Sequence, residues 1–188
     1  MPSAKPTFLW SLPLLLGACT SAAVEEPAAE TASVVEVSFI EGAPTDRFVI
    51  TNRGPCPLGE IALELDLSAS AGGLIFDTLA TGAGVEVFQP FEVEAGDIVP
   101  LADGVSDGDS SLSLRIGSLG AGDRASFTID VDDTLPSSEL GQIRVAGSEI
   151  SGAIATIASP TETVVASFTE ESLARVPVRC PKQTDKML

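Results

Sequence analysis

The chain lacks histidine and tyrosine altogether over its 188 residues. Histidine is the usual base that activates a serine or cysteine nucleophile, so its absence argues against hydrolases of those classes. A mixed Cys/His zinc site is excluded for the same reason. The only lysines after the first 18 residues, Lys182 and Lys186, stand in a polar C-terminal segment. We therefore expect a protein without enzymatic activity.

Paired carboxylates are the one catalytic alternative, since glycosidases and aspartic proteases use them. The acidic residues between positions 86 and 97 have the alternating positions of outward-facing strand residues, which favours surface charge. Asp77-Thr78-Leu79 is the segment nearest to an aspartic protease signature, and it lacks the required glycine.

Basic residues are scarce. Ten lysines and arginines stand against 27 aspartates and glutamates, which gives a formal charge of −17. Such a chain has no basic patch with which to neutralise phosphates, so nucleic acid is not expected as a partner. The apolar content of 44% excludes global disorder, and the length suits a single domain.

A long hydrophobic run is also missing. The most apolar stretch, residues 8–16, is near half of the ~20 residues that a membrane-spanning helix needs, and it contains Pro13. Lys5 precedes it and small residues follow it, which is the pattern of a signal peptide over residues 1–18.

The end of that signal, Leu16-Gly17-Ala18-Cys19, resembles the lipobox of bacterial lipoproteins. The resemblance implies that Cys19 is the lipidated first residue of the mature protein. It also implies a membrane partner through the lipid, and Thr20 in place of aspartate implies delivery to the outer membrane, on its periplasmic face or at the cell surface. The alternative is an ordinary secretory signal, cut near Ala18 or after Ala23. Residues 19–33 then form a flexible acidic tether, residues 34–180 the domain, and residues 181–188 a polar disordered tail.

Cysteine is rare, with three in the chain. If Cys19 carries lipid, Cys56 and Cys180 remain, and exported proteins usually pair such cysteines. A bridge between the two ends of the domain would contribute about 4–5 kcal/mol by the chain-entropy model. Two free buried thiols are the alternative.

From residue 34 onward the apolar residues recur with a period of two, as in half-buried antiparallel strands. Glycine and proline mark turns between these runs, and no 3.6-residue stripe is sustained. We therefore predict an all-β fold, an antiparallel β-sandwich, with a closed barrel as the second choice. The expected strands cover residues 35–39, 48–50, 61–67, 73–77, 85–88, 112–116, 127–131, 143–145, 154–157 and 164–168.

Two resemblances bear on the type of sandwich. Residues 48–54, which end in Asn52-Arg53-Gly54, and residues 119–131 are similar to immunoglobulin-like modules of bacterial surface proteins. Residues 142–168 extend past the usual module, which implies extra C-terminal strands. Residues 84–93 and 148–152 resemble uncharacterised marine bacterial proteins labelled after the sponge aggregation factor core. That resemblance implies cell-surface adhesion.

The acidic loops are the candidate metal site. Calcium takes six to eight oxygen ligands, which carboxylates and carbonyls of Gly/Asp loops supply. The best stretches are residues 103–109 and 130–133, and neither follows the EF-hand pattern. On a strand, two aspartates of the second stretch would share the outward face and converge on one ion. Solvated acidic turns are the alternative. The expected calcium ligands are Asp103, Asp107, Asp109, Asp130 and Asp132.

Phe88 and Phe91 flank Gln89-Pro90 and are the candidate partner surface, or else they close one end of the core. Together these features predict an envelope-anchored, non-enzymatic lipoprotein. It would act as a cell-surface binding or adhesion module for a protein or glycan partner, stabilised by calcium if the acidic loops bind it. The alternative is a structural or assembly accessory of the envelope without a small ligand of its own.

Overall fold

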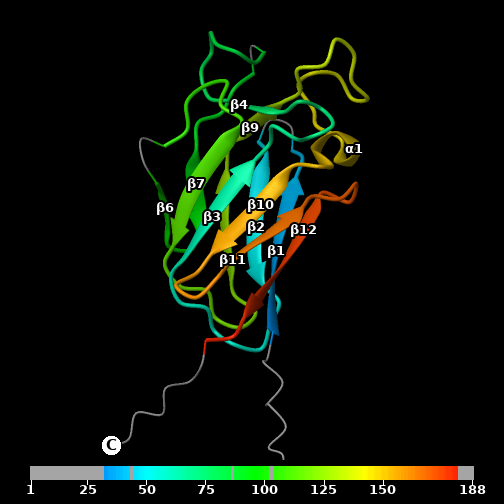
Figure 1. The fold of residues 1–188 in the computed structure, drawn as a ribbon. Coiled ribbons are helices and arrows are strands. Elements are labelled where there is room, and N and C mark those ends of the chain that lie inside the picture. Colours follow the sequence, from blue (N-terminus) through cyan, green and yellow to red (C-terminus); the bar gives the residue numbers. More distant parts are fainter. Residues whose placement is uncertain (1–31, 43–44, 86, 102–103, 182–188) are drawn as a thin grey trace, which may run out of the picture.

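A computed structural model describes residues 32–42, 45–85, 87–101 and 104–181. They form two antiparallel sheets packed face to face (Figure 1), which confirms the predicted all-β sandwich. The sheets are separate, so the closed barrel is excluded. Within these residues no helix is long and apolar enough to cross a membrane. The predicted signal, the lipobox with Cys19 and the tail from residue 182 lie outside the described residues.

Each of the two large sheets has five strands. The first has the order β12 (Leu173–Arg179), β1 (Ala32–Ile40), β2 (Arg47–Asn52), β8 (Arg124–Thr128) and β5 (Glu92–Ala95). The second has the order β11 (Thr163–Ser167), β10 (Ile154–Ala158), β3 (Ile61–Asp66), β7 (Ser111–Ile116) and β6 (Ile98–Pro100). β4 (Ile75–Asp77) and β9 (Asp130–Asp132) form a third, two-stranded sheet, and α1 (Gly147–Ile150) is a single turn. The C-terminal strands β10, β11 and β12 thus extend both large sheets.

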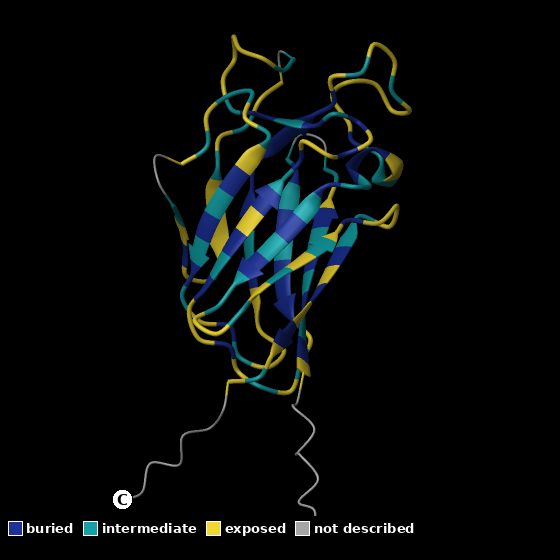
Figure 2. Cartoon of the chain, in the orientation of Figure 1, coloured by how far each residue is buried: buried dark blue, intermediate teal, exposed yellow. Residues whose placement is uncertain are grey.

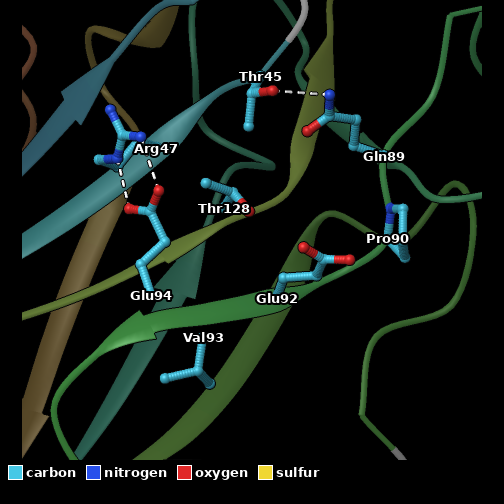
Figure 3. Close-up of a pocket in the computed structure, with 8 residues that line it drawn as sticks. All are labelled: Thr45, Arg47, Gln89, Pro90, Glu92, Val93, Glu94 and Thr128. Carbon is cyan, nitrogen blue, oxygen red and sulfur yellow. Dashed lines mark hydrogen bonds and ion pairs between the residues drawn. The ribbon is translucent and has the colours of Figure 1, made fainter.

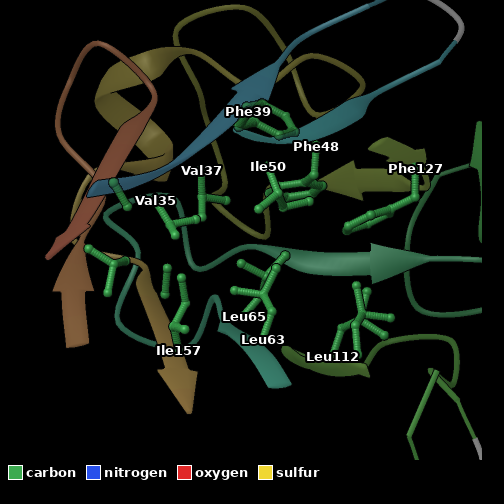
Figure 4. Close-up of a cluster of buried hydrophobic side chains, with 14 of the residues drawn as sticks. Val35, Val37, Phe39, Phe48, Ile50, Leu63, Leu65, Leu112, Phe127 and Ile157 are labelled. Atoms are coloured by element: carbon green, nitrogen blue, oxygen red, sulfur yellow. The ribbon is translucent and has the colours of Figure 1, made fainter. Parts of the chain in front are cut away.

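The core lies between the large sheets and follows from the alternation in the sequence. Val35 and Val37 of β1 are fully buried, and they face the leucines of β3 across the interior (Figure 4). The rings of Phe48 and Phe127 stack with centroids 5.3 Å apart. Burial alternates along most strands (Figure 2), as expected when successive side chains leave a strand on opposite faces. Each large buried side chain contributes about 1.5–3 kcal/mol.

Two predicted strands are wrong. Residues 87–88 lie in an irregular loop, and Ile143 and Val145 precede α1 instead of forming a ladder. Val87, Phe88 and Ile143 are each more than a third exposed, whereas Val145 is buried in the core without pairing in a sheet. The predicted run 127–131 is interrupted at Ile129, where the chain passes from β8 to β9. The first strand begins at Ala32, two residues before the predicted domain start.

The predicted disulfide is present between Cys56 and Cys180, whose Cα atoms are 5.8 Å apart. Cys180 follows β12 directly, at the end of the sandwich where β1 begins (Figure 1, bottom). β4 and β9 lie at the opposite end (Figure 1, top). The sandwich therefore has a disulfide end, where the described chain starts and finishes, and an acidic end.

Candidate metal centre

The acidic end is built on the pairing of β4 with β9. The register places Asp77 opposite Asp130 and Ile75 opposite Asp132, with Phe76 and Val131 between them. Because side chains alternate along a strand, the three aspartates share one face, and Phe76 and Val131 point to the other face, into the core. The apolar middle pair thus fixes the position of the acidic face.

Asp77, Asp130 and Asp132, hereafter the acidic cluster, come together closely. Each offers a carboxylate oxygen, and these three oxygens lie within 4.8 Å of one another. The exposed fractions of the residues are 0%, 4% and 1% respectively. Three buried like charges at this separation repel strongly unless protons or a cation compensate them.

Four oxygens of the acidic cluster lack partners among the described residues. Both oxygens of Asp77, Oδ2 of Asp130 and Oδ1 of Asp132 accept no hydrogen bond from the described residues. No arginine or lysine of the described part of the chain forms an ion pair with them. Buried polar atoms are normally satisfied, so four unpartnered carboxylate oxygens at one point indicate a place for a ligand.

A glycine-containing loop covers the acidic cluster. Val85 donates its N–H to Asp132 Oδ2 at 2.8 Å. A Cβ at Gly84 would overlap Asp132 Oδ2 and Asp77 Oδ2, so only glycine permits this approach of the backbone. Residues 78–85 therefore close over the cluster at contact distance.

Asp107 holds this loop in place. Its Oδ1 accepts the N–H groups of Thr78 at 2.8 Å and Leu79 at 3.1 Å, and its Oδ2 accepts that of Ala83 at 2.7 Å. The hydrogen bonds from Ala83 and Thr78 hold the pKa of Asp107 below its usual range, because they favour the ionised carboxylate.

The acidic cluster itself titrates in the opposite direction. Burial, with the nearby carboxylates of Asp107 and Asp132, raises the pKa of Asp77 to about 7. Burial, with the charges of Asp132 and Asp77, raises the pKa of Asp130 to about 7 as well, and burial raises the pKa of Asp132. The cluster thus resists losing its protons unless another positive charge replaces them.

Asp46 adds to this effect. Its Oδ2 accepts the N–H of Val131, between two members of the acidic cluster, at 3.1 Å. Burial, aided by the carboxylates of Glu41 and Asp130, raises its pKa to about 8.

Oxygen-only donors suit hard cations such as calcium and magnesium. The acidic cluster could therefore hold a metal ion.

Within the described part of the chain, the structure brings only two of the five predicted calcium ligands into the acidic cluster. Asp130 and Asp132 belong to the cluster, although they are buried and not on an outward face. Asp107 supports the covering loop, and Asp109 Oδ2 accepts the N–H of Ser106 at 2.8 Å. Asp103 lies outside the described residues. Asp77 was missed, because only the β4–β9 register brings it to Asp130.

The two phenylalanines of the predicted partner surface also separate. Phe91 packs against Phe127, with ring centroids 5.1 Å apart, and so joins the core. Phe88 is 38% exposed.

Comparison with known proteins gave no match to a family model, to a curated protein or to a solved structure.

Proposed function

We propose that this protein is an exported, calcium-stabilised binding module without enzymatic activity, anchored to the outer membrane through Cys19. The observation that carries the proposal is the acidic cluster, with its buried and unpartnered oxygens. A divalent cation there would neutralise most of the negative charge and provide the partners that the four oxygens lack.

Calcium fits the donor set better than other common ions. Zinc prefers nitrogen and sulfur ligands, and the chain has no histidine. Magnesium requires a strict octahedron and keeps several waters, whereas calcium accepts six to eight oxygens in irregular arrangements. Carboxylates from two strands under a glycine loop are such an irregular set.

The position of the acidic cluster supports a role in binding. The described chain begins at the disulfide end, so a tether from Cys19 would attach there (Figure 1). The loops around the cluster would then point away from the membrane. Loops at one end of a sandwich, held by a rigid scaffold, are a common place for binding residues.

Calcium titration of the full chain tests the proposal. We expect the melting temperature to rise with calcium concentration, since an ion that binds only the folded state adds about 2.7 kcal/mol at a hundred times its Kd. The variant Asp77→Asn should lose this response. In chelator it should melt above the wild type, because it removes one of three repelling charges.

The matched control is Asp123→Asn, whose carboxylate accepts a hydrogen bond from Gly120 in an exposed turn away from the acidic cluster. This variant should keep the full response to calcium. A wild-type melting temperature that does not move at millimolar calcium would refute the proposal, and so would an unchanged response in Asp77→Asn.

A further inference from the structure

A polar hollow of about 460 Å³ lies next to the acidic cluster, on the outer face of the first sheet (Figure 3). Its floor crosses three strands, because Arg47 of β2 and Glu92 of β5 are both register partners of Thr128 in β8. Thr45 and Gln89 form the rim, where the Gln89 side-chain amide donates to Thr45 Oγ1 at 2.8 Å.

The free groups of this hollow are hydrogen-bond acceptors. Arg47 is already bound to Glu94 by two hydrogen bonds, of 2.5 and 2.6 Å. The Glu92 carboxylate and Gln89 Oε1, in contrast, have no hydrogen-bond or ion-pair partner among the described residues. A free carboxylate and an amide oxygen suit a lysine ammonium or an arginine guanidinium. The formal charge of −17 would attract a basic partner to this surface.

The backbone of Gln89 joins the hollow to the acidic cluster. Its N–H donates to the carbonyl of Asp77 at 3.3 Å, and its carbonyl accepts the N–H of Asp130 at 3.3 Å. The rim residue is thus held between two members of the cluster. Movement of β4 against β9 would displace Gln89 and change the shape of the hollow.

We propose that the hollow binds a basic side chain of a partner protein and that the cation in the acidic cluster controls this binding. The inference rests on the proposed calcium site. Without the ion, repulsion among the three carboxylates weakens the β4–β9 pairing that holds Gln89. With the ion, the rim is fixed, and the ligand meets a preorganised site.

The test uses a synthetic lysine-containing peptide and, as its control, the same peptide with acetylated lysines. The affinity of each peptide for the full chain is measured by calorimetry at physiological ionic strength, once in calcium and once in chelator. We expect the wild type to bind about tenfold more tightly in calcium, and Glu92→Gln to lose about tenfold, the value of one charge-assisted hydrogen bond. The acetylated peptide should not bind.

The charge control is Glu64→Gln, which removes the same charge from the exposed side of β3 in the other sheet. It should bind the peptide as the wild type does. Equal losses in Glu92→Gln and Glu64→Gln would overturn the inference, because they indicate attraction by overall charge alone. If calcium raises the melting temperature but leaves the peptide affinity unchanged, the control by the cation is wrong while the proposed function stands. If calcium has no effect on the melting temperature, both fail.

Discussion

Gly84, in the covering loop, lies so close to the carboxylates of Asp77 and Asp132 that a side chain has no room there. Its φ is not in the left-handed region, so the requirement for glycine is one of space and not of backbone strain. The same holds at Gly82, where a Cβ would overlap the carboxylate of Asp107. Glycine at these positions keeps the loop against the acids.

Gly84→Ala should therefore damage the cation site. The added methyl group must push the loop or the carboxylates apart, and overpacking of this kind costs about 1–3 kcal/mol. We expect a lower free energy of unfolding in calcium and a weaker response of the melting temperature to calcium, both measured by thermal and urea denaturation.

Gly59→Ala is the control, because a Cβ at Gly59 would meet nothing within 4 Å. Its stability and its calcium response should match those of the wild type. If Gly84→Ala behaves like Gly59→Ala, the close approach of the loop to the acidic cluster is not required for binding.

The sequence predicts only some of the residues of the acidic cluster and not their burial. The Asp130-Val131-Asp132 pattern correctly indicates two carboxylates on one face of a strand. Their burial does not follow from it, because the loop that covers them comes from residues 78–85, far away in the sequence. Asp77 ends a short apolar run. This position indicates a metal ligand only once β4 is known to pair with β9, which places Asp77 opposite Asp130.

The β4–β9 pair, with its acids buried, predicts an unusual pH dependence. An unfolded aspartate has a pKa of about 3.9, whereas Asp77 and Asp130 in the folded protein have pKa values of about 7. Between these values the folded state binds more protons than the unfolded state. In chelator, stability should therefore fall as the pH rises from about 4 to 8, because buried Asp46 has a pKa of about 8, and it should level off above that range.

Thermal melts across this interval measure the effect. Saturating calcium should reduce the fall, since the ion stabilises the ionised carboxylates. Asp77→Asn should reduce it too, and this separates the cluster from the general repulsion of an acidic chain. A melting temperature that rises with pH in chelator would contradict the raised pKa values.

The strands show which sequence patterns are sufficient to predict a strand. β1, β3 and β7 are predictable because their alternation spans five residues or more between clear turns, and β2 because Phe48 and Ile50 alternate just before the Asn52-Arg53-Gly54 turn. β5 is not among the predicted strands, although its glutamates have the alternating positions of outward-facing residues: its four residues are all exposed, and its pairing with β8 contains a register shift, so no apolar period marks it. β12 was missed although Ala174, Val176 and Val178 alternate correctly, and Pro177 is tolerated because the strand lies at a sheet edge.

At the scale of the whole molecule, the disulfide joins segments separated by 124 residues. Cross-linking so long a segment lowers the entropy of the unfolded chain and stabilises the fold by about 4–5 kcal/mol in the chain-entropy model. The double variant Cys56→Ala/Cys180→Ala should lose about that much free energy of unfolding in urea denaturation.

The wild type in reducing agent should lose stability to a similar extent, and the double variant should not respond to the reductant. An unchanged denaturation midpoint in the double variant would mean that the rest of the sandwich holds its two ends together without the bridge.

The disulfide end also determines how the molecule would carry mechanical load. β1 lies between β12 and β2, paired with the first over residues 32–38 and with the second over residues 35–40. Glu36 of β1 also forms ion pairs with Arg53, just beyond β2, and Arg175 of β12. A force that pulls Ala32 away from the acidic end would act parallel to β1. It would shear both hydrogen-bond ladders of β1 together and would not open them one bond at a time. The Cys56–Cys180 bridge, just beyond the ends of β2 and β12, keeps those two strands from separating around β1.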